Sequence, residues 1–91
     1  MISDATHARI LRKVAARALG ELHNARRIAT AAPTDDNVRT AYRHAVLASR
    51  TLRRAAEVTP DESGAMLAEA AHVDAAAVGL LDELVRSSTW G

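Results

Sequence analysis

The residues with the clearest chemical potential are Glu69 and His72. Their spacing of three residues would place a carboxylate and an imidazole on one face of a helix, and both groups bind transition metals. A helical di-iron site uses two such pairs and two further glutamates. The nearest second pair, Glu21 and His23, has the wrong spacing. We therefore expect no metal site, and the absence of a glycine-rich phosphate loop predicts no bound cofactor.

Two arginine–histidine pairs have spacings at which the two side chains could act together on a phosphodiester. Arg39 and His44 are separated by four residues, which resembles the arginine-to-histidine motif of HEPN-type helical ribonucleases; Arg17 and His23 fit the looser form of that motif. The resemblance implies an RNA-cleaving pair on one helix. On a helical wheel, however, Arg39 and His44 point about 140° apart.

A second enzymatic resemblance is to the all-helical chorismate mutases. Arg9 and Arg26 are widely spaced in the first third of the chain, and Asp36 with Arg39 resembles a family motif. The resemblance implies a small dimeric enzyme. Thr40 stands where the family has a glutamate, and the family's lysine between the two segments is missing. We keep a small helical enzyme as an alternative and predict a protein without catalytic residues or a small-molecule substrate.

The composition predicts one small domain, residues 1–91, with a thin core. The apolar fraction is 48%, but 21 of these residues are alanines, which bury little area. Self-association would relieve this deficit. There is no cysteine, and the longest apolar run, residues 75–81, is far shorter than a membrane span. Without a charged-then-apolar leader, we expect a cytoplasmic protein with no membrane partner.

The charges are segregated along the chain. Residues 1–33 carry six basic and two acidic side chains, and residues 34–58 carry five and three. Residues 59–91 carry one basic and six acidic side chains, so this third of the chain has a net charge of −5 while the rest has +6. Such a split favours binding between oppositely charged surfaces.

Two prolines divide the chain into three helical segments, which we expect at about 4–31, 35–57 and 60–87. Ser3 or Asp4 should cap the first helix and Thr34 the second, and Thr59 with Glu62 has the spacing of a capping box for the third. Each segment has a heptad stripe. The stripes are Leu11, Ala15, Ala18, Leu22, Ala25 and Ala29; Val38, Ala41, Ala45, Ala48, Leu52 and Ala55; and Met66, Ala70, Val73, Ala77, Leu80 and Leu84. The short connections predict an all-α antiparallel three-helix bundle, whose core oligomerisation would complete. A helical hairpin with a dimerising third helix is the alternative.

Four arginines form a ladder along the second helix. Their spacings of four, seven and four residues place them within about 60° of one another on the solvent side. They are Arg39, Arg43, Arg50 and Arg54. The ladder is either an ordinary solvated face or a surface for an anionic partner: phosphate, an acidic protein, or the acidic third helix of another copy. Nucleic acid is therefore an alternative partner, although the chain is nearly neutral and almost lacks aromatic residues for stacking.

The third helix has a second apolar stripe beside its heptad stripe. It consists of Leu67, Ala71, Asp74, Val78, Leu81 and Val85. Together the two stripes cover about half of the helix surface, more than one face of a small bundle requires. Asp74, near the middle, must pair with a cation of its own chain or fix the register of an interface. We predict an interaction module that uses this stripe to bind a protein partner or itself as a homo-oligomer.

Overall fold

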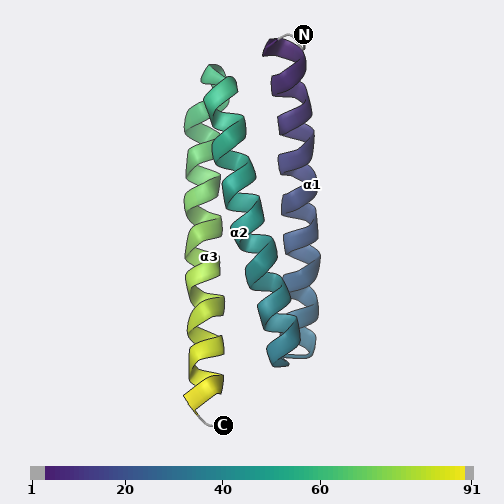
Figure 1. Ribbon diagram of the computed structural model, residues 1–91, viewed down its shortest axis with the longest axis vertical. Helices are drawn as coiled ribbons and strands as arrows, with labels where there is room; N and C mark the ends of the chain where they lie inside the picture. Colours follow the sequence, from purple (N-terminus) through teal and green to yellow (C-terminus); the bar gives the residue numbers. More distant parts are fainter. Residues whose placement is uncertain (1–3, 90–91) are drawn as a thin grey trace.

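The computed structural model describes the backbone of residues 4–89 and the side chains of residues 5–87. It contains α1 (Asp4–Ala31), α2 (Asp35–Val58) and α3 (Ser63–Thr89), with a single 3₁₀ turn, η1 (Pro60–Glu62), before α3. The helices run down, up and down in Figure 1, and the described residues contain no strand. The predicted all-α three-helix bundle is therefore confirmed, with helix bounds close to those expected.

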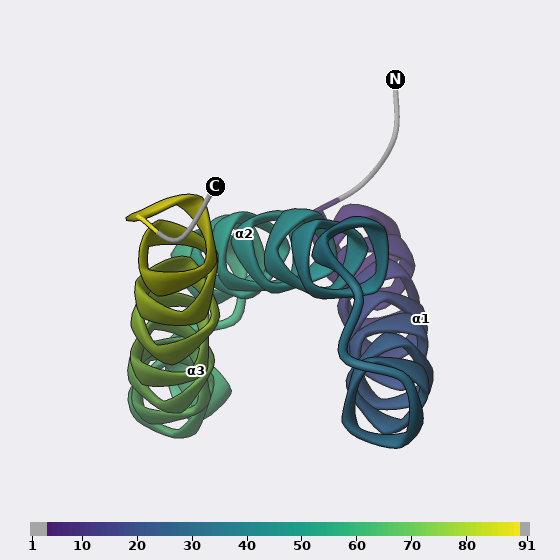
Figure 2. The same ribbon diagram turned by 90° about the horizontal axis from the view of Figure 1, so that it is seen from below.

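α2 is the central helix and packs against both of the others. Among the described residues, no Cα atom of α1 lies within 8 Å of one in α3. Viewed along the bundle, the three helices form a U, with α2 at its closed end and α1 and α3 as its two arms (Figure 2). α1 and α3 therefore each have only one helix as a close neighbour.

The core consists of the predicted heptad stripes. The predicted α2 stripe is buried throughout, and four of its alanines, Ala41, Ala45, Ala48 and Ala55, have no exposed surface. In α1 and α3 the stripes are buried except at four larger residues that are half-buried: Leu11, Met66, Leu80 and Leu84. No large side chain among the described residues is completely enclosed. The core is as thin as the alanine content predicts, because small side chains allow close helix approach but bury little area.

The first junction follows the prediction. Thr34 has an extended backbone, and its hydroxyl accepts a hydrogen bond of 3.2 Å from the backbone amide of Asn37. Asp35 and Asp36 occupy the first turn of α2, where negative charge is favoured by the helix dipole. Ser3, one of the two caps proposed for α1, lies outside the described residues.

The second junction corrects the prediction of a capping box. The Thr59 hydroxyl turns back and donates to the carbonyl of Ala55 in α2, with the sulfur of Met66 3.2 Å away, so it makes no cap for the next helix. The Glu62 carboxylate is 3.0 Å from a guanidinium nitrogen of Arg12 in α1. The Thr59 hydroxyl is thus taken by a bond one turn back in α2 and the Glu62 carboxylate by a contact with α1, and a 3₁₀ turn precedes α3 instead.

Candidate protein-interaction surface

The second stripe of α3 lies on the surface of the single chain. The exposed fractions are 43% for Leu67, 67% for Val78, 45% for Leu81 and 55% for Val85. Ala71 is also exposed, and the Asp74 side chain is 46% exposed. We call these six residues the α3 strip. Each lies one position after a residue of the heptad stripe that packs on α2, so the strip is rotated by about 100° from that contact. Neither α1 nor α2 covers it.

Asp74, the one polar residue of the strip, has partners within its own chain. Hydrogen bonds from the side chains of Ser49 and Arg53 in α2 hold the pKa of its carboxyl below the usual range, and the charge of Arg53 acts in the same direction. Burial acts in the opposite direction, toward a higher pKa. Of the two roles predicted for Asp74, pairing with a cation of its own chain is the one observed. The strip therefore carries no uncompensated charge at its centre.

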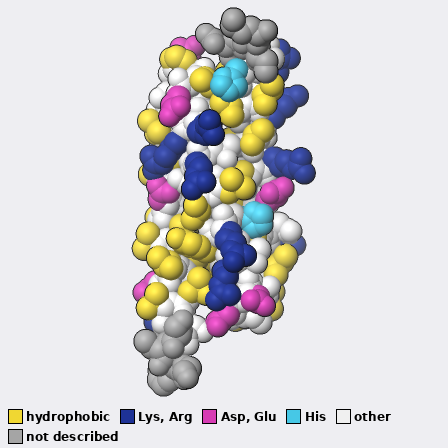
Figure 3. Space-filling view, in the orientation of Figure 1, with side chains coloured by type: hydrophobic (Ala, Val, Ile, Leu, Met, Phe, Trp, Pro, Cys, Tyr) yellow, Lys and Arg dark blue, Asp and Glu magenta, His cyan; other side chains and the backbone are white. Residues whose placement is uncertain are grey.

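The four ladder arginines line the outer side of α2, and we call them the arginine row. All four are exposed: Arg39, Arg43, Arg50 and Arg54. Figure 3 shows basic side chains along the middle of this face, over α2, with apolar side chains on both sides of them. An acidic neighbour is present at one end, because Asp36 lies 3.9 Å from Arg39. The row is thus a solvated basic surface bordered by apolar groups.

A second exposed apolar strip follows the junction of α1 and α2, and sequence reasoning missed it. It consists of Ile10, Val14, Ile28 and Leu47, which are 45–48% exposed. We call these residues the α1–α2 strip. Val14 and Ile28 stand seven residues before and after Glu21, which places all three on one line along α1. His44 Nδ1 of α2 is 3.9 Å from Glu21 Oε2, and Leu47 is one turn beyond His44. The four apolar side chains therefore share one side of the molecule.

The two strips border the arginine row from opposite sides. The α3 strip meets α2 at Arg53, which precedes Arg54 and bonds Asp74. Leu47 of the α1–α2 strip lies four residues after Arg43 and three before Arg50, on the same helix face. The α2 side of the molecule thus carries an apolar strip, a basic row and a second apolar strip.

Glu69 and His72, the pair whose spacing was compared with that of a di-iron site, lie in a groove between α1 and α3. Glu69 and His72 line a cavity of about 210 Å³ together with His23 and Arg26 of α1. The fold therefore brings a second histidine beside the Glu69–His72 pair, which the sequence spacing did not indicate. Within residues 4–89, however, no three histidine, aspartate or glutamate side chains are close enough to share a metal ion.

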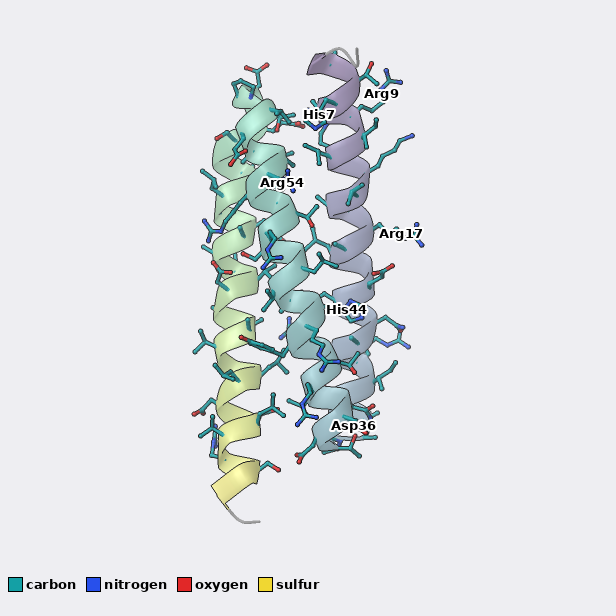
Figure 4. All side chains as sticks on the ribbon, in the orientation of Figure 1. His7, Arg9, Arg17, Asp36, His44 and Arg54 are labelled. Atoms are coloured by element: carbon teal, nitrogen blue, oxygen red, sulfur yellow. The ribbon has the colours of Figure 1, made fainter. Side chains whose placement is uncertain are left out.

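The arginine–histidine pairs are separated in space. Arg39 lies near Asp36 on the outer side of α2, whereas His44 is turned toward Glu21 of α1. In the second pair, Arg17 of α1 points away from the bundle, as Arg9 does (Figure 4), whereas His23 lines the groove between α1 and α3. Arg26 lines a larger groove of about 560 Å³ between α1 and α3 with Glu83 and Arg86, but Arg9 does not. The residues of the two enzymatic resemblances are therefore not gathered in one site.

The stretch Pro60–Ser87 is long and apolar enough to cross a membrane by length and composition alone. The alanine-rich core helix of a water-soluble bundle can meet the same criterion. Asp74, with its arginine partner, lies in the middle of the stretch, and charged groups at this depth are unfavourable in lipid. A protein without a membrane partner stays a prediction.

Comparisons with known proteins give no relative from which a function could be transferred. No protein-family model matches the chain. No curated protein and no solved structure matches it either.

Proposed function

We propose that this chain is a non-enzymatic helical interaction module that associates with a second copy of itself through the α3 strip. The observation that carries the proposal is the exposure of Leu67, Val78 and Leu81, each more than 40% exposed on one side of a single helix. Isolated exposed apolar residues are common, but a row of them at heptad spacing is typical of a helix that packs against another helix.

The thin core supports self-association. The single chain buries mainly alanines, and many of its larger aliphatic side chains are left half-exposed at the surface. Burying a leucine or valine completely stabilises by roughly 1.5–3 kcal/mol relative to leaving it exposed. A second copy that covers the α3 strip would recover about half of this free energy at each position.

The chemistry of Asp74 also supports docking at the strip. An unpaired carboxylate at the centre of an interface would oppose association, because removing a lone charge from water is costly. Arg53 and Ser49 already satisfy this carboxylate, so a partner helix needs to bring no cation of its own.

The test compares the self-association of the wild-type chain with that of the double variant Val78→Thr, Leu81→Gln. Neither change alters the net charge, and both positions are exposed. Each of the two substitutions removes about 1 kcal/mol of apolar burial and places a polar group in the interface. We therefore expect the dissociation constant of the double variant to be about 100-fold higher than that of the wild type. Sedimentation over a range of protein concentrations measures this. The matched control is Ala16→Gln, at an exposed position of α1 outside both strips.

A wild-type chain that stays monomeric at high micromolar concentration would contradict the proposal. So would a double variant that associates as strongly as the wild type. If the wild type is monomeric but binds a different protein through the α3 strip, the proposed self-association is contradicted and the proposed binding surface is supported.

A second candidate function, nucleic-acid binding, is favoured by the arginine row. Its four guanidinium groups share one exposed face of α2, and aligned cations release counterions from a phosphate backbone. Fluorescence anisotropy with a labelled duplex and a labelled single strand tests this at 50 and 200 mM salt. Binding that falls steeply with salt and is lost in Arg43→Glu, Arg50→Glu supports it, and undetectable binding at 50 mM salt ends it.

A further inference from the structure

We infer that the α3 strip and the arginine row together form a docking surface for an anionic phospholipid membrane. The inference goes beyond the proposed function, because lipid is a second kind of occupant for the strip. Asp74 belongs to the strip and bonds Ser49 and Arg53 of α2. Each of these two α2 residues is followed directly by an arginine of the row, Arg50 and Arg54. Strip and row therefore lie side by side, on the same side of the α2–α3 junction.

The arginine row has more positive charge than its own chain neutralises. α2 has no acidic residue between Asp36 and Glu57, which lie at the two ends of the row. Asp36 is 3.9 Å from Arg39, and the other three arginines of the row form no ion pair with any described residue. A ligand that covers this surface must therefore bring several negative charges of its own.

A second copy does not supply these charges from α3. Of the four acidic residues of α3, Asp74 and Asp82 are paired with arginines of their own chain, and Glu69 and Glu83 line the grooves toward α1. Nucleic acid would supply phosphates, but it has no apolar surface for the strip. An anionic bilayer offers both partners, since its headgroups bind basic side chains and its acyl chains accept apolar ones.

The strip suits shallow insertion along the membrane surface. Leu67 and Val85 are 18 residues apart, which is about 27 Å of helix. A helix lying in the interface buries its apolar side by about 5–10 Å, while neighbouring arginines stay at the level of the phosphates. Asp74 is neutralised by Arg53, so the strip carries no unpaired charge to this depth. The prediction of no membrane partner rested on the length of the apolar runs, a criterion that concerns spanning helices and not binding at the surface.

Co-sedimentation with vesicles tests the role of the row. The wild type should bind vesicles of phosphatidylcholine with about 30% phosphatidylglycerol, and it should not bind phosphatidylcholine alone. Arg43→Gln, Arg50→Gln should weaken binding about 30-fold, roughly fivefold for each arginine. The matched control is Arg9→Gln, Lys13→Gln, which removes the same charge from exposed positions on the side of α1 away from α2. Its effect should stay below about threefold, because salt screens charges at that distance from the bilayer.

Two measurements test the role of the strip. Val78→Thr, Leu81→Gln should weaken binding to the same vesicles on the order of tenfold, because less apolar surface enters the bilayer. Both positions are exposed, so the variant is expected to fold, which circular dichroism verifies. Since the chain has no cysteine, a polarity-sensitive fluorophore can be attached to Val78→Cys, and its emission should shift to the blue when the vesicles are added. The same fluorophore on Ala16→Cys should not respond.

Four outcomes would overturn the inference. They are no binding to the anionic vesicles at 50 mM salt, equal binding to neutral vesicles, equal losses in the row variant and its matched control, and a strip variant that binds as the wild type does. The last result would indicate that the row binds polyanions such as nucleic acid without apolar insertion. None of these results bears on the proposed function, because self-association is measured without lipid.

Discussion

α2 and α3 are neighbours of similar length, yet their buried and exposed sides are built in opposite ways. α2 lies between two helices, and its core positions are mostly alanines with no exposed surface. Its outer side carries the arginine row. α3 lies at the edge, where its large side chains Val78 and Leu81 are left in contact with solvent. In this molecule small residues hold the fold, and many of the large ones remain available for a partner.

The largest expected effect is on the free energy of unfolding, when a leucine of the core and a leucine of the α3 strip are each replaced by alanine. Leu22 is 4% exposed in the main core cluster, so Leu22→Ala should lower the free energy of unfolding by about 2–5 kcal/mol. Leu81→Ala, at 45% exposure, should cost the monomer less than about 1 kcal/mol. Urea unfolding of dilute protein measures both. Equal losses at the two positions would show that α3 is covered in the monomer.

The reverse substitution sharpens the comparison. Ala45 of α2 has no exposed surface, so Ala45→Leu should destabilise the fold by about 1–3 kcal/mol through overpacking. Ala71→Leu on the α3 strip should change the unfolding free energy of the monomer by less than about 0.5 kcal/mol and should tighten self-association. A stable Ala45→Leu variant would mean that the α2 core has room that the structure does not show.

The two junctions of α2 should respond differently to loss of a predicted cap. Thr34→Ala removes a cap hydrogen bond and should cost about 1 kcal/mol in thermal or urea unfolding. Glu62→Ala removes only an exposed ion pair with Arg12, so its effect should stay below about 1 kcal/mol. The ranking would be reversed if Glu62 acted as a helix cap.

The smallest effect concerns Asp74 and pH. Its folded-state pKa is lowered from 3.8 by Ser49 and Arg53, so the contribution of its carboxylate to stability is present above that value. It is lost as the pH falls through the lower, folded-state pKa. Asp74→Asn should therefore unfold with a weaker pH dependence than the wild type below about pH 4. An NMR titration that gives the Asp74 carboxyl a pKa at or above 3.8 would contradict its stabilisation by Ser49 and Arg53.

Much of the fold could be predicted from the sequence, because the heptad stripes and the residues around Pro33 act locally. The predicted capping box at Thr59 was wrong because the Thr59 hydroxyl bonds the carbonyl of Ala55, one turn back in the same helix, and because Arg12 of α1, which pairs with Glu62, is brought there only by tertiary packing. The α3 strip was visible as a second heptad row. The α1–α2 strip was not, because Leu47 lies on a different helix from Ile10, Val14 and Ile28 and comes to the same side of the molecule only in the folded chain.

The central claim is that another copy covers the α3 strip, and its most direct test is the accessibility of Val78. Because the chain has no cysteine, Val78→Cys provides a single thiol whose labelling rate can be followed in a reducing buffer as protein concentration rises. Ala16→Cys is the control. We predict that labelling at position 78 slows severalfold with concentration while labelling at position 16 does not change. A rate at position 78 that is independent of concentration up to the high micromolar range would contradict the account.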